Sequence, residues 1–467
     1  MKPILVIQMQ RMGDLIMTFP LLLWLSRRFP GQEIVVVAEP GFYNTLAPLG
    51  PGVTYVSASQ SKAILEREYS LVINVSHRRE GALLAGKVKA DETIGPYVDQ
   101  DDNLYIRGNW HVYRASLVDC NRHNTFHWAE LNALDVIAPD EIRATTWPIP
   151  RELPGHNPKV GLFLGASQAA KRPQTLFWRD VAQGLLDRGM RPILLGGPEE
   201  RALGDAVQKG LELPVLHLAG TTSLDQLARI GQTLQLMVTP DTGPMHLAAW
   251  TGLRVLNLSM GPVNPWETGP YHPGHYILRT TISCSGCWSC RFEEPRCRGR
   301  FNARKVVRLV DEVIHHREHN LHKMTFPGLE LMRSSRSQGL YWLNRIGSPR
   351  RHPSCRQVLD QWWHGIWQWH FGLCHAEQAQ NAAALLRATF PDLAAIMRTR
   401  LLGHCRRLVS RRGADPLIYH DLFDGQEIPA LAPCVRFARL TLENSNFSRT
   451  SRLAVLALFE RILSLFD

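Results

Sequence analysis

Hydrophobic and polar positions follow a regular order along the first 150 residues, where short apolar runs are each followed by a longer amphipathic stretch. The apolar runs have the length and β-branched composition of buried strands, and the longer stretches have the spacing of helices. Strands that alternate with helices indicate a parallel, doubly wound sheet. In chain order these segments are PILVIQ, DLIMTFPLLLWLSRRF, EIVVVAE, GFYNTLAPL and SLVINVS.

A proline-rich joint, WPIPRELPGHNP at 147–158, separates this unit from a second unit with the same order of elements. Two such units in tandem leave a cleft between them, and ligands of these folds bind outside the carboxyl ends of the strands. We therefore expect an α/β fold with one domain at 1–150 and another at 151–322. The segments of the second unit are KVGLFLG, LFWRDVAQGLLDRG, PILLGG, EERALGDAVQKG, LMVT, PMHLAAWTG and VLNLSM.

The alternation ends near residue 323, and the rest of the chain shows helical spacing without alternating strands. We expect a mostly helical extension at 323–467, whose role the sequence does not indicate. Within it Trp362, Trp363, Trp367 and Trp369 form a cluster that we assign to a core or an interface.

Charge and hydrophobicity narrow the range of partners. The chain carries a formal net charge of +11 and has an isoelectric point of about 9.4, which favours phosphate groups, an acidic glycolipid or a membrane surface as partners. We expect no nucleic acid partner.

No run reaches the roughly 18 apolar residues that a spanning helix needs, and the N-terminus lacks the features of a signal peptide. We therefore expect a cytoplasmic protein that is at most peripheral at the inner membrane.

Two common nucleotide-binding motifs are absent. No G-x-G-x-x-G follows the first apolar run, and G-x-x-x-x-G-K-[ST] occurs nowhere in the chain. Because these glycine-rich turns hold the phosphates in Rossmann dehydrogenases and P-loop NTPases, both classes of enzyme are disfavoured.

The segment VTPDTGPMHLAAW joins an apolar run to a helical stretch, with a turn at Asp241, Thr242 and Gly243. Pro244 suits the first helical position, so the N–H groups of the turn should point outward at a helix N-terminus. A diphosphate is stabilised there by unpaired donors and by the helix dipole. His246, about one turn into the helix, could reach the same anion. The alternative is a capping aspartate followed by a histidine in the core.

Two further junctions carry polar residues at the same end of the predicted second sheet. In LGASQAAK, Ser167 offers a hydroxyl donor and Lys171 a mobile positive charge, unless both belong to a solvated loop. In LLGGPEE, Glu199 or Glu200 could accept hydrogen bonds from the hydroxyls of a ribose, or serve only as acids in the first turn of a helix. Junctions that share one edge of a sheet favour one shared anionic ligand.

At the start of the first unit, Asp14 lies where a strand passes into a helix, in the stretch RMGDLIMTFPLLLWL. From the neighbouring residues alone, Asp14 is either a helix cap or an acid that takes part in a reaction in the cleft. The helix dipole should favour its ionised form. Arg11 beside it either binds a phosphate or carboxylate of an acceptor or is a solvated surface residue.

The order of these motifs resembles the family 9 glycosyltransferases, the bacterial lipopolysaccharide heptosyltransferases. The resemblance covers about residues 1–320 and rests on GDLIMTFP, LVINV, LGASQAAK, LLGGPEE, LAGTTSLDQL, PDTGPMHLAAW and GPVNPWETGPY. It implies a GT-B architecture, in which two Rossmann-like domains face a cleft and bind the acceptor in the first domain and the sugar nucleotide in the second. It also implies that Asp14 is the general base. The residues it assigns to the sugar nucleotide are Ser167, Lys171, Glu199 or Glu200, Asp241, Thr242, Gly243 and His246.

A cysteine cluster lies outside these motifs. Cys284, Cys287, Cys290 and Cys297 have the spacing C-x2-C-x2-C-x6-C, and four thiolates so close in sequence can close a tetrahedral site for Zn or Fe. An iron–sulfur cluster and unligated reduced thiols are the alternatives. The cluster resembles the cysteine-rich finger of autotransporter heptosyltransferases, which implies a structural metal. We expect catalysis itself to need no cofactor.

Three hypotheses for function follow. The first is an inverting glycosyltransferase that moves a sugar, heptose from ADP-heptose, to a lipopolysaccharide core or related glycan at the inner face of the membrane. The second keeps the donor but takes a protein hydroxyl as the acceptor. The third is a non-catalytic GT-B-like scaffold that binds a partner through its cysteine cluster and helical extension.

Overall fold

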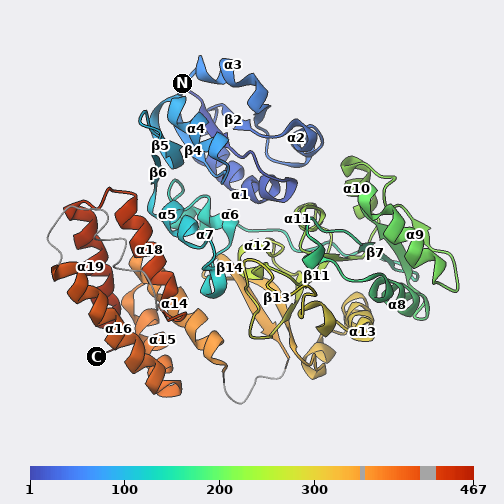
Figure 1. The fold of residues 1–467 in the computed structure, drawn as a ribbon. Coiled ribbons are helices and arrows are strands. Elements are labelled where there is room, and N and C mark those ends of the chain that lie inside the picture. The colour runs from blue at the N-terminus through green and yellow to red at the C-terminus, as the bar shows by residue number, and fades with distance from the viewer. Residues whose placement is uncertain (348–352, 411–427, 467) are drawn as a thin grey trace.

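The computed structural model of the protein describes residues 1–347, 353–410 and 428–466. Along the chain, two α/β domains, each with its own sheet, are followed by a group of helices (Figure 1). The predicted extension at 323–467 therefore lies partly outside the described residues.

The first domain is built on a six-stranded sheet. Its strands are β1 (Ile4–Ile7), β2 (Ile34–Val37), β3 (Thr54–Val56), β4 (Glu68–Asn74), β5 (Lys89–Val98) and β6 (Leu104–Arg107). Their order is β3-β2-β1-β4-β5-β6, and every pair is parallel except β5 with β6. The runs ILVI and IVVV of β1 and β2 are fully buried, as expected for parallel strands covered on both faces. The strand order reverses between β1 and β4, so a ligand is expected at their carboxyl ends.

The second domain is built on an eight-stranded sheet. Its strands are β7 (Lys159–Phe163), β8 (Arg191–Leu195), β9 (Leu216–His217), β10 (Leu236–Pro240), β11 (Val255–Ser259), β12 (Tyr276–Thr280), β13 (Leu329–Ser337) and β14 (Leu340–Ile346). Their order is β14-β13-β12-β11-β10-β7-β8-β9, with the reversal between β7 and β10. Strands β7 to β12 pair in parallel, whereas β12, β13 and β14 pair antiparallel.

The antiparallel hairpin corrects the prediction that no strand follows residue 323. Its tip, Gln338 and Gly339, has positive φ at both residues, which is the backbone of a tight two-residue turn. The sequence pattern did not predict this hairpin, because its strands and its tip contain many polar residues. The second sheet therefore extends into the segment that was assigned to the extension.

Helices cover the sheets and form the C-terminal group. In the two α/β domains they are α1 (Met12–Arg28), α2 (Pro40–Leu46), α3 (Ser61–Leu65), α4 (Arg79–Lys87), α5 (Asn109–Ser116), α6 (Trp128–Leu131), α7 (Pro139–Arg143), α8 (Thr175–Leu186), α9 (Arg201–Lys209), α10 (Leu224–Gly231), α11 (Gly243–Trp250), α12 (Pro265–Thr268) and α13 (Ala303–Ile314). The C-terminal group consists of α14 (Cys355–His370), α15 (Ala376–Thr389), α16 (Pro391–Ser410), α18 (Ala432–Glu443) and α19 (Arg449–Leu463).

The tryptophan cluster forms the core of the C-terminal helices. Trp362, Trp363 and Trp367 are almost completely buried on α14, and the indole N–H of Trp363 donates to the Ala430 carbonyl at 2.9 Å. The prediction of a core role is confirmed for these three residues. Trp369 is half-buried at the end of the same helix.

Side-chain contacts join the C-terminal helices to the first domain, and the first domain to the second. Asn444 closes the edge of the first sheet, because its amide oxygen accepts from the Ile106 N–H at 2.6 Å and its amide nitrogen donates to the Ile106 carbonyl at 2.7 Å. On the other side, buried Glu130 of the first domain accepts from the Tyr341 N–H at 2.6 Å and from Arg336 at 3.0 Å, both in the hairpin. These contacts tie the two domains together across the cleft.

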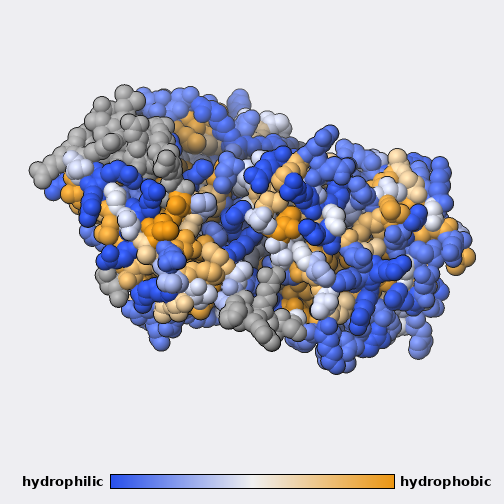
Figure 2. Space-filling model, turned by 60° about the horizontal axis from the view of Figure 1, so that its bottom comes forward, coloured by the Kyte–Doolittle hydropathy of each residue, from blue (hydrophilic) through white to orange (hydrophobic). Residues whose placement is uncertain are grey.

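Hydrophobic residues are scattered over the molecular surface in small groups. On the face shown in Figure 2, the orange groups are bordered by hydrophilic residues. Among the described residues, no helix combines the length and the hydrophobicity that crossing a membrane requires. Most long apolar runs of the sequence are buried in the cores around the two sheets.

Candidate active site

The N-termini of α1 and α11 meet across the cleft between the two α/β domains (Figure 1). Glycine permits this approach, because a Cβ added to Gly13 would stand 3.1 Å from Cδ2 of His246 and 3.5 Å from Cα of Gly243. Each helix follows a strand next to the point where its sheet reverses order. Two helix N-termini, both carrying unpaired N–H donors and positive dipole ends, therefore face one space.

This space is a cavity of about 610 Å³. Eight of the predicted site residues line it, although their sequence positions range from 11 to 246. They are Arg11, Asp14, Ser167, Lys171, Asp241, Thr242, Gly243 and His246. The structure therefore brings the acid of the first domain and the anion-binding residues of the second into one site.

Asp14 occupies the third position of α1 and also caps that helix. Its carboxylate accepts a hydrogen bond from the Arg11 N–H at 3.2 Å. Burial raises the pKa of Asp14 above its usual value, while Arg114 and Arg11 act in the opposite direction. The sequence indicated only the helix dipole, which favours the ionised form, whereas the loss of water around the buried carboxyl acts against that form and outweighs the favourable charges of the two arginines. A raised pKa makes Asp14 a stronger base than an exposed aspartate.

Arg114 is a charged neighbour of Asp14 that the sequence did not reveal. It is buried on α5, where it donates to the Val75 carbonyl at 3.0 Å and lies 2.7 Å from Nε2 of His77. Burial lowers the pKa of Arg114 to about 10, against the effect of Asp14 and Glu267. Its positive charge favours the ionised form of Asp14 and so acts against the rise in the Asp14 pKa that burial causes.

Lys171, Asp241 and Thr268 form a chain of contacts on the opposite wall. The Asp241 carboxylate accepts from the Thr268 hydroxyl at 2.7 Å and lies 3.7 Å from Nζ of Lys171. Both members of this ion pair have little exposed side-chain surface. Because both carboxylate oxygens of Asp241 have such partners, it orients Lys171 and Thr268.

His246 is buried on α11 directly opposite Gly13. Burial lowers its pKa to about 4, with Asp241 opposing this shift and Lys171 adding to it. The imidazole is therefore neutral near pH 7 and can donate one hydrogen bond without carrying a charge.

Glu199 and Glu200 lie apart from the main cavity and differ sharply in burial. Both line an adjoining cavity of about 230 Å³ that shares Ser167 and Thr242 with the first. The Glu199 side chain is 81% exposed, whereas that of Glu200 is 10% exposed. Glu200 accepts from the Gly197 N–H at 2.9 Å. Only Glu200 is therefore held in a fixed position within this part of the site.

Glu267 is a further acid in the cleft that the sequence did not reveal. It is buried, and it accepts from the side-chain amides of Asn121 at 2.7 Å and Asn124 at 3.0 Å. Burial raises the pKa of Glu267 to about 8, against the hydrogen bonds from these amides. The segment GPVNPWETGPY marked this region, but no local pattern linked it to asparagines more than 140 residues earlier.

The predicted four-thiolate metal site stays a prediction, because the part of the chain that the structure describes does not show it. Within the described residues, no group of three or more His, Cys, Asp or Glu side chains is arranged to hold a metal ion. Cys297 accepts from the Gly261 N–H at 3.3 Å, and the Cys290 thiol lies 3.5 Å from the Phe292 carbonyl. The four cysteines still lie near one another, because Cys284, Cys290 and Cys297 each add to the rise that burial causes in the pKa of Cys287.

The same loop adds an aromatic side chain to the cleft. Trp288 lies between Cys287 and Cys290, lines the main cavity and is 42% exposed. The cysteine loop therefore forms one wall of the site, although the thiols themselves do not line it.

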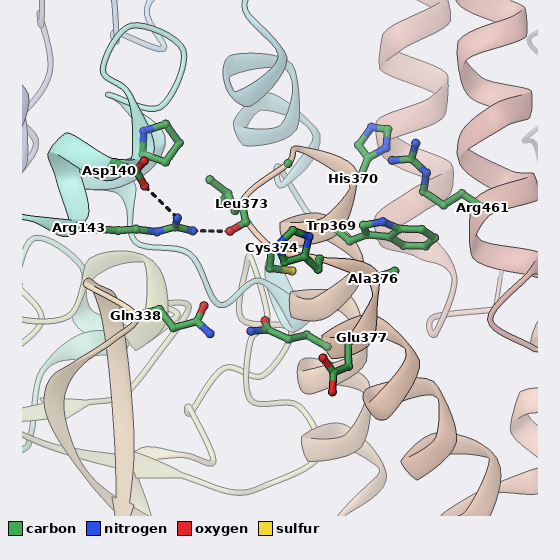
Figure 3. A pocket seen from close by; sticks show the side chains of 14 residues that line it. Asp140, Arg143, Gln338, Trp369, His370, Leu373, Cys374, Ala376, Glu377 and Arg461 are labelled. Carbon is green, nitrogen blue, oxygen red and sulfur yellow. Dashed lines mark hydrogen bonds and ion pairs between the residues drawn. The ribbon is translucent and has the colours of Figure 1, made fainter.

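A larger cavity, of about 1000 Å³, lies away from all of these residues, between α7, the tip of the β13–β14 hairpin and the corner of α14 and α15 (Figure 3). Its arginines already have partners. Arg143 donates to Asp140 at 3.3 Å and to the Leu373 carbonyl, and Arg461 stacks on Trp369 at 5.0 Å. None of the predicted site residues lines this cavity, so we place the active site in the cleft.

Comparisons with known proteins agree with this geometry. The model of the family Glycosyltransferase family 9 (heptosyltransferase) matches residues 58–295, just over half of the chain. Lipopolysaccharide heptosyltransferase 1 of Pseudomonas aeruginosa is 25% identical over 358 residues, which cover 67% of this chain and 98% of that protein. The similarity leaves about a third of this chain without a counterpart in that relative.

Solved structures share the fold. A family 9 glycosyltransferase from Veillonella parvula aligns with a TM-score of 0.53 and 19% identity over 68% of this chain and 98% of its own. The ADP-heptose lipopolysaccharide heptosyltransferase II of Escherichia coli aligns with a TM-score of 0.51 and 19% identity over 68% of this chain and 99% of its own. The expected GT-B architecture is thus confirmed. The chain belongs to glycosyltransferase family 9, the heptosyltransferase family, and is a glycosyltransferase.

Proposed function

We propose that this enzyme transfers heptose from ADP-heptose to the core of lipopolysaccharide, with inversion at the anomeric carbon. One observation carries the proposal: Asp14 on the wall of the first domain and Lys171 on the wall of the second line one cavity. A base and an anion-binding site on opposite walls are what a single displacement at a sugar diphosphate requires. The similarity to a lipopolysaccharide heptosyltransferase supports the choice of sugar and acceptor.

The second domain, whose sheet runs from β7 to β14, would bind the donor. The N-terminus of α11 at Thr242 and Gly243, the hydroxyl of Ser167 and the ammonium of Lys171 would hold the diphosphate, whose negative charge grows as the bond to the sugar breaks. Asp241 would keep Lys171 in place through their ion pair. The adjoining cavity would take the nucleoside, with Glu200 rather than Glu199 on the ribose because only Glu200 is buried and fixed.

The first domain, at 1–150, would bind the acceptor. The carboxylate of Asp14 would accept the proton of the attacking hydroxyl as that oxygen forms the bond to the anomeric carbon. Burial raises the pKa of Asp14, which strengthens it as a base, and the charge of Arg114 favours its ionised form. Arg11, exposed at the start of α1, would bind a phosphate or carboxylate of the acceptor. Such an acceptor would place the reaction at the inner face of the membrane.

A donor and acceptor screen tests the proposal. The full chain is incubated with ADP-heptose, UDP-glucose or GDP-mannose, each with lipopolysaccharide that lacks core heptose, and the products are weighed by mass spectrometry. The proposal predicts a mass increase of one heptose with ADP-heptose alone. Transfer from another sugar nucleotide would refute the donor, and transfer only to a protein hydroxyl in a parallel reaction would refute the acceptor.

A further inference from the structure

A separate cavity of about 570 Å³ lies where the second domain, the first domain and the C-terminal helices meet. Its wall comes from the end of β12 and the loop after it, from the start of α14, from α16 and from the short segment before α18. Its volume is in the range of pockets that enclose small-molecule ligands. None of the residues proposed to bind the sugar nucleotide lines it.

One end of this cavity is cationic. Arg356 lies against Arg122, because its guanidinium donates to the Arg122 backbone carbonyl at 3.2 Å and its charge acts on the Arg122 side chain. Within the described chain no carboxylate lies within ion-pair distance of Arg122, and Asp360 is 3.9 Å from Arg356 while it also bonds His123 at 2.7 Å. Burial and the charge of Arg356 lower the pKa of Arg122. Two adjacent cations that share one distant acid favour an added anion.

The other end is apolar. Aliphatic side chains from α14, α16 and the segment before α18 line it, and Ile396 remains 49% exposed. An apolar ligand group on this wall would cover the exposed Ile396 side chain, which is favourable because it removes apolar surface from water. The apolar residues are Leu359, Leu393, Ile396, Ile428, Pro429 and Ala430.

This cavity adjoins the catalytic cleft along the chain. Asn121 lines the cleft and Arg122 lines the cavity. The cysteine loop also joins them, because Ser283 lines the cavity and Trp288 lines the cleft. Arg122 and Arg356 donate to the Ser283 and Ser285 carbonyls of that loop at 3.1 and 2.7 Å. A molecule that reaches past this loop would contact both spaces.

We propose that this cavity binds the lipid part of a glycolipid acceptor, with a phosphate or carboxylate on Arg122 and Arg356 and a hydrocarbon chain on the aliphatic wall. The assignment to the acceptor rests on the proposed function, whereas the preference for an anionic amphiphile rests on the cavity alone. Glu330 and Arg345 also line this cavity, but they pair with each other at 2.9 Å, so the cationic pair of Arg122 and Arg356 is not neutralised by Glu330.

Binding of a simple probe tests the site without turnover. Decyl phosphate, decyl maltoside and inorganic phosphate are titrated into the full chain by calorimetry, below the concentration at which the amphiphiles form micelles. We expect decyl phosphate to bind at least about tenfold more tightly than either other probe, since it alone supplies both groups. Equal binding of decyl maltoside, or equal binding of inorganic phosphate, would overturn the proposal.

Variants locate the binding. Ile396→Glu places a charge on the aliphatic wall and should weaken decyl phosphate by about tenfold or more. Leu453→Glu changes a similarly exposed aliphatic residue on α19, 56% exposed, and should leave the affinity unchanged. Unchanged binding in Ile396→Glu would overturn the site. Decyl phosphate should also raise the KM for a lipid-bearing acceptor and leave the KM for ADP-heptose unaltered. If decyl phosphate binds as expected but no heptose is transferred, the proposed function fails and the anionic site stands.

Discussion

Glu267 should make the stability of the protein depend on pH in a way that one substitution removes. Its pKa is about 8 in the folded protein and 4.5 ordinarily. Between these values an unfolded chain releases the proton and the folded chain keeps it, so stability falls as pH rises. The slope is at most about 1.4 kcal/mol per pH unit, or about 5 kcal/mol over the whole interval. Below pH 4.5 and above pH 8 this residue should cause no further change.

Buried histidines act in the opposite direction at lower pH. His246, His272, His364 and His370 have pKa values of about 4, so they add stability as pH rises toward 6.5. These histidines act equally in the wild type and in a variant at Glu267, so the difference between the two proteins isolates Glu267. The contribution of Glu267 itself should fall by about 2 kcal/mol between pH 6.5 and 8.

Glu267→Gln keeps the shape of the side chain and cannot ionise. Asn121 can rotate its amide to accept from the new amide, because its own oxygen has no hydrogen-bond partner. The free energy of unfolding is measured with urea and tryptophan fluorescence at several pH values. The difference between the variant and the wild type should grow in the variant's favour by about 2 kcal/mol from pH 6.5 to 8. If the free energies of unfolding of the variant and the wild type change in parallel with pH, the role given to Glu267 is refuted. Glu66→Gln, which changes an exposed carboxylate, is the control for the loss of a charge.

Three further predictions concern the cleft. Gly13→Ala should lower kcat by about tenfold or more, because its Cβ would press on Cδ2 of His246 at 3.1 Å and separate the two helix ends; an unchanged kcat would contradict the close approach. Glu200→Gln should raise the KM for the donor by about tenfold and the matched Glu199→Gln should not, as steady-state kinetics would show; equal effects would refute the assignment to Glu200. Lys171→Met should weaken binding of ADP in calorimetry by about tenfold or more, and full affinity would remove Lys171 from the diphosphate site.

The order of strands and helices could be predicted where the sequence alternates in the usual way. Buried parallel strands are continuous apolar runs, so β1, β2, β7 and β8 were visible without tertiary information. The hairpin of β13 and β14 was missed because half of its residues are polar and its partner strand, β12, lies about 50 residues earlier. A strand of mixed polarity cannot be recognised from its own residues, because only its pairing with the edge of a sheet identifies it.

The site could be predicted where a motif sits at the end of a strand. Asp14 and Lys171 were found this way, and the fold brings them to one cavity. Arg114 and Glu267 were missed because their partners are distant in sequence, and only burial gives their charges any consequence. The choice between the two adjacent glutamates depends on which one the chain buries. The cysteine spacing predicted a metal site that stays a prediction, since spacing alone does not determine how the four thiols are arranged.

The central claim is that Asp14 is the base that deprotonates the acceptor. The direct test is Asp14→Asn, which preserves the shape of the side chain and its place at the start of α1. We predict that transfer of heptose falls by about 10² to 10⁴. The affinity for ADP-heptose, measured by calorimetry, should change by less than about twofold, because the donor site lies on the other domain. Transfer within about tenfold of the wild-type rate, with the donor still bound, would contradict the account.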